Sequence, residues 1–247
     1  MKKKVFDSFI SIGSFNKLIN NIFLLSEENI SSYVCVCNVH MLVEAQQDHG
    51  FNELLNNADI VTPDGMPIAK ILSWKYKINQ ERVSGMDMLP TLIKECAIRN
   101  KSIYFYGSTN DVLANIKKNT KKDFFKLKTK FYSPPFRELI KEEKQEIIND
   151  INNFNPDFVF VALGCPKQEK WMATHKGAIN SCMIGLGGAF SVYAGLQKRA
   201  PKWMSNNSLE WLYRLLIEPN RLFGRYFFTN SLFIWYICKY ILKRNNK

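Results

Sequence analysis

Short apolar runs alternate with amphipathic segments along most of the chain. Runs rich in Val, Ile, Phe and Tyr predict strands over residues 33–38, 58–61, 103–106, 127–132, 158–163 and 182–186. Apolar positions at helical spacing predict helices over residues 41–48, 88–100, 108–118 and 138–153. The third helix is predicted to begin with Ser108 and Asp111 as an N-cap pair. This alternation is typical of an α/β fold with a mostly parallel sheet.

The apolar run at residues 158–163 stops abruptly in a polar loop. A run of this kind is typical of a central parallel strand covered on both faces, and ligands bind at the carboxyl ends of such strands. Gly164 permits close backbone approach to a ligand, and Pro166 suits the first helical position. The helix start then carries a cation, an amide and a carboxylate: Lys167, Gln168 and Glu169. Taken alone, a polar surface turn explains this segment equally well.

Other loops are predicted to reach the same edge of the sheet. They are residues 38–40, 62–65, 107–109 and 185–189. Gly107, Gly187 and Gly188 expose backbone N–H groups and are candidates for phosphate-binding turns. For Gly187 and Gly188, tight packing of the following helix on the sheet is an equally good explanation.

Two charged residues are further candidates for chemistry. Asp64 stands in a Pro-Asp-Gly turn after a short apolar strand, so its carboxylate is rigidly aimed near the ligand edge. The alternative is that Pro-Asp-Gly is simply a favourable turn sequence. Arg82 either binds phosphate or pairs with Glu81 on the surface.

Near the C-terminus, three arginines recur at helical spacing. Arg214, Arg221 and Arg225 are seven and four residues apart, so one helical face presents all three if Pro219 only kinks the helix. Guanidinium groups bind a diphosphate through bidentate hydrogen bonds. An exposed face paired with nearby glutamates is the competing interpretation.

The net charge of +12 implies an anionic partner, which is a nucleic acid, an anionic membrane or a phosphorylated substrate. Residues 198–247 carry ten of the basic residues and only two acids. Residues 226–242 are aromatic and apolar but too polar to span a bilayer, and they fit a helix lying in the headgroup region. A packed C-terminal core helix is the competing interpretation. The lysines at 117–130 are interpreted as a solvated helix face.

Several classes of protein receive little support. The six cysteines lie mostly in apolar runs without a CxxC pair, which favours reduced, buried thiols and a cytosolic location. Asp7 interrupts the segment where a signal peptide needs an unbroken apolar core. The three histidines lie far apart and no Asp-x-Asp motif occurs, so no metal site is expected. The histidines are His40, His49 and His175.

Taken together, the motifs resemble the WecG/TagA/CpsF family of bacterial glycosyltransferases. They occur in the order ADIVTPDGMPIAK, ERVSGMDML, IYFYGS, PDFVFVALGCPKQEKWM, IGLGGAFSVYAGLQKRAPKWM and LEWLYRLLIEPNRLFGRY. The likeness covers about residues 33–226. The resemblance implies a Rossmann-like core at residues 1–198. It also implies a C-terminal appendage at residues 199–247 that completes the active site and contacts the membrane.

The activity implied by the resemblance is an inverting transfer that needs neither a metal nor a cofactor. A sugar, most often N-acetylmannosamine, moves from a UDP-sugar donor to a polyprenyl-diphosphate-linked sugar at the inner face of the cell membrane. The product serves cell-surface polysaccharide or teichoic acid synthesis. A nucleic acid is not an expected partner, and homo-oligomerisation is left open.

The resemblance also assigns residues to roles. Asp64 is implied as the general base, beside the site residues Asn38, Arg82 and Gln168. The expected donor or diphosphate contacts are Gly107, Gly164, Lys167, Glu169, Gly187, Gly188, Arg214, Arg221 and Arg225. The chain has Val36 where some members have a threonine, which leaves the sugar open. The alternatives are UDP-glucose or another hexose donor, and a nonenzymatic nucleotide- or nucleic-acid-binding protein.

Overall fold

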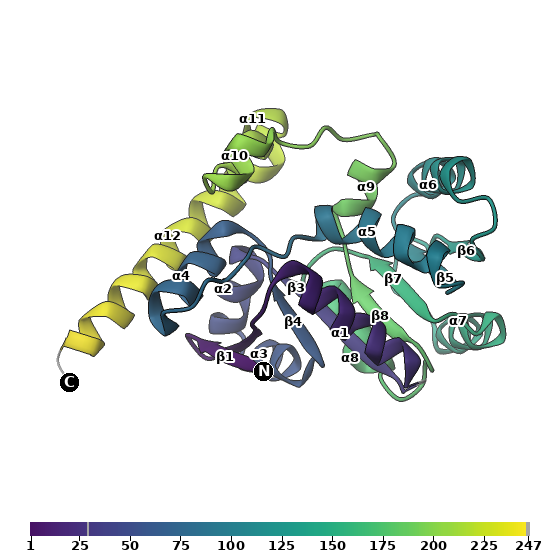
Figure 1. Cartoon of the computed structure of the whole chain (residues 1–247), viewed down its shortest axis with the longest axis horizontal. Helices are drawn as coiled ribbons and strands as arrows, with labels where there is room; N and C mark the ends of the chain where they lie inside the picture. Colours follow the sequence, from purple (N-terminus) through teal and green to yellow (C-terminus); the bar gives the residue numbers. More distant parts are fainter. Residues whose placement is uncertain (29, 246–247) are drawn as a thin grey trace.

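A six-stranded parallel sheet forms the centre of the molecule (Figure 1). The computed structural model describes residues 1–28 and 30–245, apart from the side chains of residues 221, 225 and 243–245. The strand order is β4-β3-β8-β7-β5-β6, and every neighbouring pair is parallel. The strands are β3 (Ser32–Cys37), β4 (Ile60–Pro63), β5 (Ile103–Gly107), β6 (Thr129–Tyr132), β7 (Phe158–Ala162) and β8 (Cys182–Gly185). The predicted parallel α/β sheet is therefore confirmed.

Strand β7 shows why the central strands are apolar throughout. Phe158 and Phe160 face one hydrophobic core, whereas Val159 and Val161 face the other. All four are fully buried. Because side chains alternate between the two faces of a strand and both faces are covered, no polar position remains in the run.

Helices cover both faces of the sheet. The first face carries α1 (Phe15–Glu27), α5 (Gly85–Ile98), α6 (Asn110–Asp123) and α9 (Ala189–Tyr193). The second carries α2 (Val39–Gln47), α3 (His49–Asn57), α4 (Met66–Tyr76), α7 (Lys141–Phe154) and α8 (Lys167–His175). The sequence patterns located α2, α5, α6 and α7 to within a few residues. They missed α1, α3, α4 and the antiparallel hairpin of β1 (Lys2–Val5) and β2 (Ser8–Ser11).

The predicted N-cap of α6 is wrong by one residue. Thr109 is the N-cap, and its hydroxyl accepts a hydrogen bond from the N–H of Val112. Ser108 instead adopts a left-handed conformation with φ of 67°, and its N–H donates to the carbonyl of Ala162. The chain needs this extra residue to turn from β5 into the helix after the close contact at Gly107.

Pro219 begins a new helix rather than kinking one. The C-terminal segment (residues 199–247) contains α10 (Lys202–Asn206), α11 (Glu210–Ile217) and α12 (Pro219–Asn245). Proline lacks the N–H that a helix interior needs but fits a first turn, so α11 stops before it. The prediction that three arginines share one helical face is therefore wrong, because Arg214 lies on α11 and the other two positions lie on α12. The side chains of Arg221 and Arg225 fall outside the described part of the structure.

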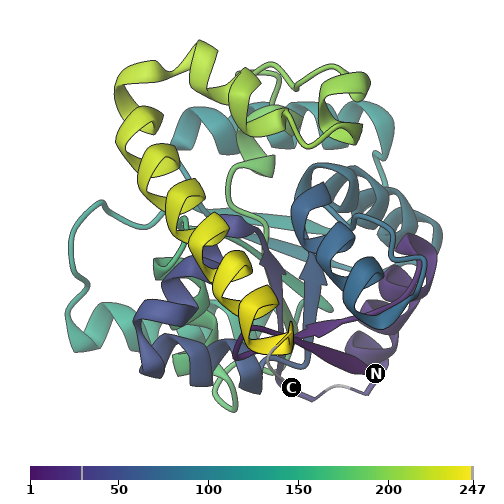
Figure 2. The ribbon, with the colours of Figure 1, turned by 90° about the vertical axis from the view of Figure 1, so that its left-hand side faces the viewer.

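Helix α12 runs across the molecule beside α2 (Figure 2). Leu222 and Phe233 are buried, and Phe233 contacts the ring of Phe6 with ring centroids 6.0 Å apart. This side confirms the interpretation of α12 as a packed helix. Its other side exposes large apolar side chains, namely Phe223, Phe227, Phe228, Ile234, Trp235 and Leu242. Among the described residues, no helix is both long and apolar enough to cross a bilayer.

Replacing Gly107 with Ala is expected to destabilise the fold through a backbone clash. A Cβ atom there would lie 2.7 Å from the carbonyl oxygen of Ala162, and φ is +105°. The left-handed strain alone costs about 1–3 kcal/mol, and the clash adds to it. Gly177→Ala is the control, because φ is +92° but nothing lies within 4 Å. Urea unfolding should show a clearly larger loss for Gly107→Ala, and equal losses would contradict the packing explanation.

Candidate active site

Backbone hydrogen bonds bring three predicted site residues together at the carboxyl edge of the sheet. The N–H of Asp64 donates to the carbonyl of Cys37 at 2.8 Å, which holds the Pro-Asp-Gly turn against the end of β3. The N–H of Val83 donates to the carbonyl of Pro63 at 3.0 Å, so the segment with Arg82 runs beside the same turn. Asn38 follows β3 directly and caps α2, with its side-chain oxygen 3.1 Å from the N–H of Met41.

Asp64 has an unusual electrostatic environment. The residue as a whole is half-buried, and its carboxyl is packed among neighbouring groups. Burial raises the pKa of Asp64 to about 7, and the carboxylate of Glu210 adds to this effect. Arg82, the Ser84 hydroxyl and Arg214 pull the pKa in the opposite direction. A carboxyl that titrates near neutral pH can accept a proton and release it again at physiological pH.

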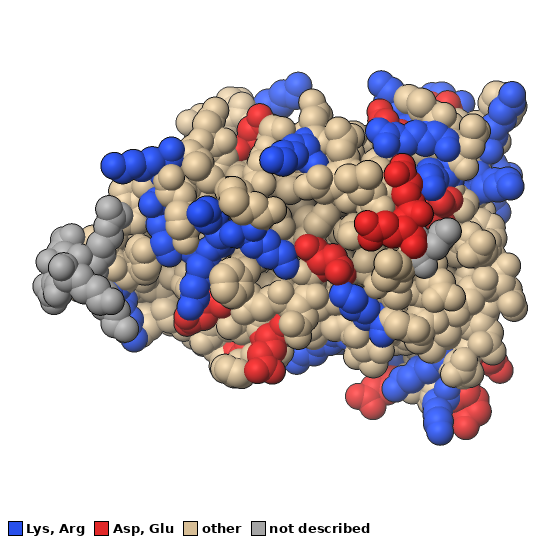
Figure 3. Space-filling view, turned by 60° about the horizontal axis from the view of Figure 1, so that its bottom comes forward, with Lys and Arg blue, Asp and Glu red and all other residues tan. Residues whose placement is uncertain are grey.

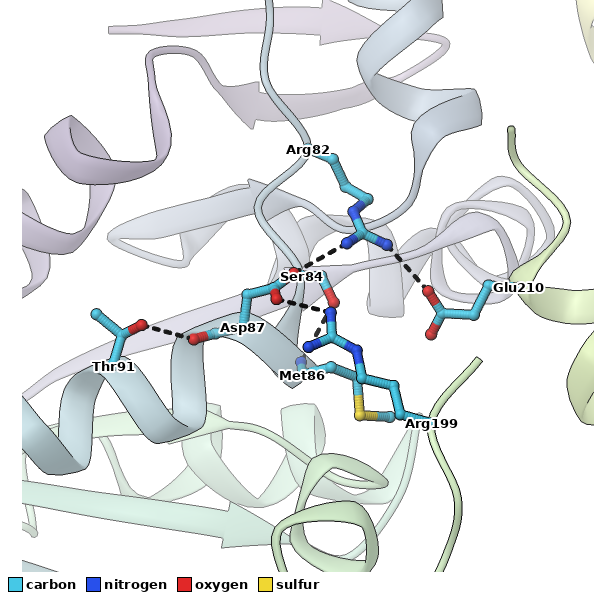
Figure 4. Close-up of polar contacts among 7 residues, drawn as sticks. All are labelled: Arg82, Ser84, Met86, Asp87, Thr91, Arg199 and Glu210. Carbon is cyan, nitrogen blue, oxygen red and sulfur yellow. Dashed lines mark hydrogen bonds and ion pairs between the residues drawn. The ribbon is translucent and has the colours of Figure 1, made fainter. Parts of the chain in front are cut away.

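Arg82 pairs with two carboxylates, neither of which is Glu81. Its Nη2 lies 2.9 Å from Oδ2 of Asp87, and its Nη1 lies 3.0 Å from Oε2 of Glu210 (Figure 4). Glu81 instead accepts the N–H of Phe15 at 2.7 Å, so the predicted alternative pair of Arg82 and Glu81 is wrong. Sequence reasoning missed Asp87 because a carboxylate in a first turn is ordinary helix chemistry, and Glu210 because 128 residues separate it from Arg82.

Gln168 lies beneath the loop that follows β8. Its Nε2 donates to Oε1 of Glu169 at 2.7 Å, and its Oε1 accepts the N–H of Gly164 at 3.3 Å. A Cβ atom would come within 3.0 Å of this amide at Gly185 and within 3.1 Å at Gly187. These glycines therefore allow the loop to lie close against Gln168, whose amide is held by Gly164 and Glu169.

Glu169 lies behind Gln168, fully buried. Burial raises the pKa of Glu169 to about 7, although the Gln168 amide partly offsets this effect. Its Oε2 has no hydrogen-bond partner among the described residues. The predicted carboxylate at this helix start is therefore not on the surface of the site. Gly164 and Lys167 are exposed in the same turn, at the start of α8.

Arg214 brings a cation from α11 to the loop that follows β8. A Cβ atom at Gly188 would lie 3.0 Å from Nη2 of Arg214, so the guanidinium lies against this glycine. Beside it is a cavity of about 610 Å³ between this loop and α11. It is lined by Gly188, Ser191, Leu196, Gln197, Lys198, Arg214, Ile217 and Glu218. The lining has two cations, Lys198 and Arg214, against one carboxylate, Glu218, and with its hydrogen-bonding groups it suits a negatively charged, hydroxylated ligand.

Gly107 and Val36 are explained by packing. Gly107 lies against the backbone of Ala162 at the end of β7, so close packing of two neighbouring strands explains this glycine, a reason that the sequence pattern did not predict. Val36 is 6% exposed within the core, and Gly85 lies directly over it. Within residues 1–28 and 30–245, no group of three His, Cys, Asp or Glu side chains is arranged to hold a metal ion.

Comparison with known proteins gives a consistent result. The model of the glycosyl transferase WecG/TagA/CpsF family matches residues 3–247. An N-acetylglucosaminyldiphosphoundecaprenol N-acetyl-beta-D-mannosaminyltransferase of Bacillus spizizenii is 32% identical over 79% of this chain and 75% of its own length. Proteins of the same name from Bacillus subtilis and Staphylococcus aureus are 30% and 26% identical, over 79% and 83% of this chain and 75% and 81% of their own lengths.

Glu169→Gln is expected to flatten the pH dependence of stability. Because the folded-state pKa of Glu169 is raised to about 7, the folded protein retains a proton that the unfolded chain releases near its ordinary value of 4.5. The contribution of Glu169 to the free energy of unfolding is therefore greatest at low pH. It falls by roughly 3 kcal/mol in total as the pH rises from about 4.5 to about 7. Urea unfolding of the variant between about pH 5 and pH 8 should show most of this decrease in unfolding free energy removed.

Glu142→Gln on the exposed side of α7 is the matched control, and it should keep the wild-type pH dependence. An unchanged slope in Glu169→Gln would show that Glu169 is ionised in the folded protein.

Proposed function

The chain belongs to the WecG/TagA/CpsF family of glycosyl transferases, and on this basis we propose that it is an inverting, metal-independent enzyme. We propose that it moves a hexose from a UDP-sugar to a polyprenyl-diphosphate-linked sugar during synthesis of a cell-surface polysaccharide or teichoic acid. N-acetylmannosamine is the proposed sugar and N-acetylglucosamine the proposed acceptor residue, because the relatives carry those sugars in their names.

The main support for this proposal is the position of Asp64 at the carboxyl edge of the sheet, together with its raised pKa. In the proposed reaction its carboxylate takes the proton of the acceptor hydroxyl as that oxygen bonds to the anomeric carbon. The bond from this carbon to the UDP oxygen breaks at the same time, on the opposite face of the sugar. One displacement of this kind inverts the anomeric centre. With a pKa near 7, Asp64 is ionised in about half of the protein molecules at neutral pH, and the ionised form can accept a proton.

The leaving diphosphate needs positive charge near the opposite face. Arg214 and Lys198 line the cavity beside Gly188 and supply two cations there. Charge placed in advance where a leaving group develops its own charge lowers the barrier to transfer. Asn38 directly follows β3 and Gln168 lies in the first turn of α8, after β7, and we assign both to positioning the sugars.

We further propose that the protein binds the inner face of the membrane through α12. The exposed aromatic side of this helix and nearby lysines support the proposal, because aromatic rings enter the headgroup region and lysines attract anionic lipids. Lys75 lies 4.5 Å from the ring centre of Tyr240, and Lys3 lies 5.0 Å from that of Tyr76. Figure 3 shows basic side chains near the end of the molecule where α12 ends and also at the opposite end.

Asp64→Asn is expected to lower turnover by about 100- to 10,000-fold, because it removes the proton acceptor but keeps the shape of the side chain. UDP release should be measured for a panel of UDP-sugars with a synthetic lipid-diphosphate N-acetylglucosamine, with and without EDTA. Binding of UDP to the variant, followed by calorimetry, should stay close to wild type. Wild-type turnover in the variant, or complete loss of wild-type activity in EDTA, would contradict the proposed mechanism.

Phe223→Ser with Phe227→Ser is expected to weaken binding to anionic vesicles at least tenfold. Both rings are exposed and they stack on each other, so the fold does not depend on burying them. Cosedimentation with phosphatidylglycerol vesicles measures the effect. Phe125→Ser is the matched control, since this ring is 79% exposed on the loop between α6 and β6. Equal binding by the double variant and the control would assign α12 to packing alone.

A further inference from the structure

Four charged side chains form one continuous row between the core and the C-terminal segment (Figure 4). Glu210 Oε2 lies 3.0 Å from Arg82, and Arg82 lies 2.9 Å from Oδ2 of Asp87. The other carboxylate oxygen of Asp87 lies 2.6 Å from Nη2 of Arg199. Arg82 and Asp87 come from the core, whereas Arg199 and Glu210 come from the C-terminal segment.

Arg82 is the most enclosed member of this row. Its side chain is 12% exposed, compared with 25% for Glu210 and 35% for Asp87. The N–H of Val83, the next residue, donates to the carbonyl of Pro63, so the backbone of Arg82 lies close to that of Asp64. An arginine that paired with Asp64 directly would stabilise the carboxylate and make it a poor proton acceptor.

We propose that Asp87 and Glu210 are positioning residues for the transfer: they hold the Arg82 guanidinium from two sides, so that it does not pair with Asp64, which remains able to take the acceptor proton. The inference rests on the proposed function. Arg199 clamps Asp87 from the C-terminal segment and contributes no contact to Arg82. The base is therefore complete only when α11 lies against the core, because α11 delivers Glu210.

The groups facing Asp64 come from several elements. Arg82 and Ser84 lie before α5, and Glu210 and Arg214 lie on α11. The thiol of Cys37 on β3 is also within electrostatic range. Besides burial, the Glu210 carboxylate raises the pKa of Asp64, and both arginines and the Ser84 hydroxyl lower it. Loss of the Glu210 charge removes one of the effects that raise the pKa of Asp64. It also frees one side of Arg82, whose positive charge lowers that pKa, so both changes act in the same direction.

The test compares Glu210→Gln, Asp87→Asn and Arg199→Gln in two measurements. The first is the dependence of kcat/KM on pH, whose rise reports the ionisation of the base in the free enzyme. Glu210→Gln and Asp87→Asn should move this rise to lower pH by about 1–3 units, because Arg82 then turns toward Asp64. Arg199→Gln should lower activity without moving the rise, since Asp87 still holds Arg82.

The second measurement is the carboxyl ¹³C titration of Asp64 in the ligand-free protein, assigned with Asp64→Asn. It needs no substrate, so it tests the inference even if the proposed transfer fails in the first measurement. The same downward movement in Glu210→Gln and Asp87→Asn supports the inference. A midpoint that stays at the wild-type pH in both folded variants would overturn it and leave the row as a purely structural link.

A double-mutant cycle identifies Arg82 as the cause. If the freed guanidinium lowers the midpoint, Glu210→Gln should lower it less in an Arg82→Gln background than in the wild type. Equal movements in both backgrounds would assign the effect to the Glu210 charge alone and would contradict the role of Arg82.

Discussion

The parallel arrangement of the sheet is the constraint on which the site depends. Six parallel strands end at one edge, so the loops after β3, β4, β7 and β8 meet there although they lie far apart in the sequence. Hydrogen bonds from Asp64 to Cys37 and from Val83 to Pro63 then fix the loops against one another. Ligand chemistry concentrates at this edge because backbone groups and side chains beyond the strands are not used by the ladder itself.

Charge balance governs how the C-terminal segment meets this edge. The segment is strongly basic, yet one of its few acids, Glu210, pairs with the most enclosed arginine of the core. In return, Asp87 of the core pairs with Arg199 of the segment. Arg214 remains against Gly188, beside the cavity. The four partly buried charges of Arg82, Asp87, Arg199 and Glu210 are tolerated because each has a partner of opposite sign, and their contact specifies one arrangement of the segment.

Helix α12 combines two properties that looked like alternatives. One side packs beside α2 and buries Leu222 and Phe233, while the other exposes a series of aromatic rings. A single amphipathic helix can serve both purposes, because residues three and four apart share a face. Large exposed apolar patches on a protein usually mark an interaction surface. The relatives are named for an acceptor built on undecaprenol, which is consistent with the membrane contact proposed above for this surface.

The fold class, the central strands and the family could all be predicted from the amino-acid sequence alone. Continuous apolar runs, glycine-ended loops and the ordered motifs are local properties, and they are readable without coordinates. Which charged groups meet depends on the tertiary structure. It separated Arg214 from α12 at Pro219, placed Glu169 behind Gln168, and joined Arg82 to Glu210 across 128 residues. Ion pairs, burial and shifted pKa values depend on distances between remote segments, and no spacing within the sequence encodes those distances.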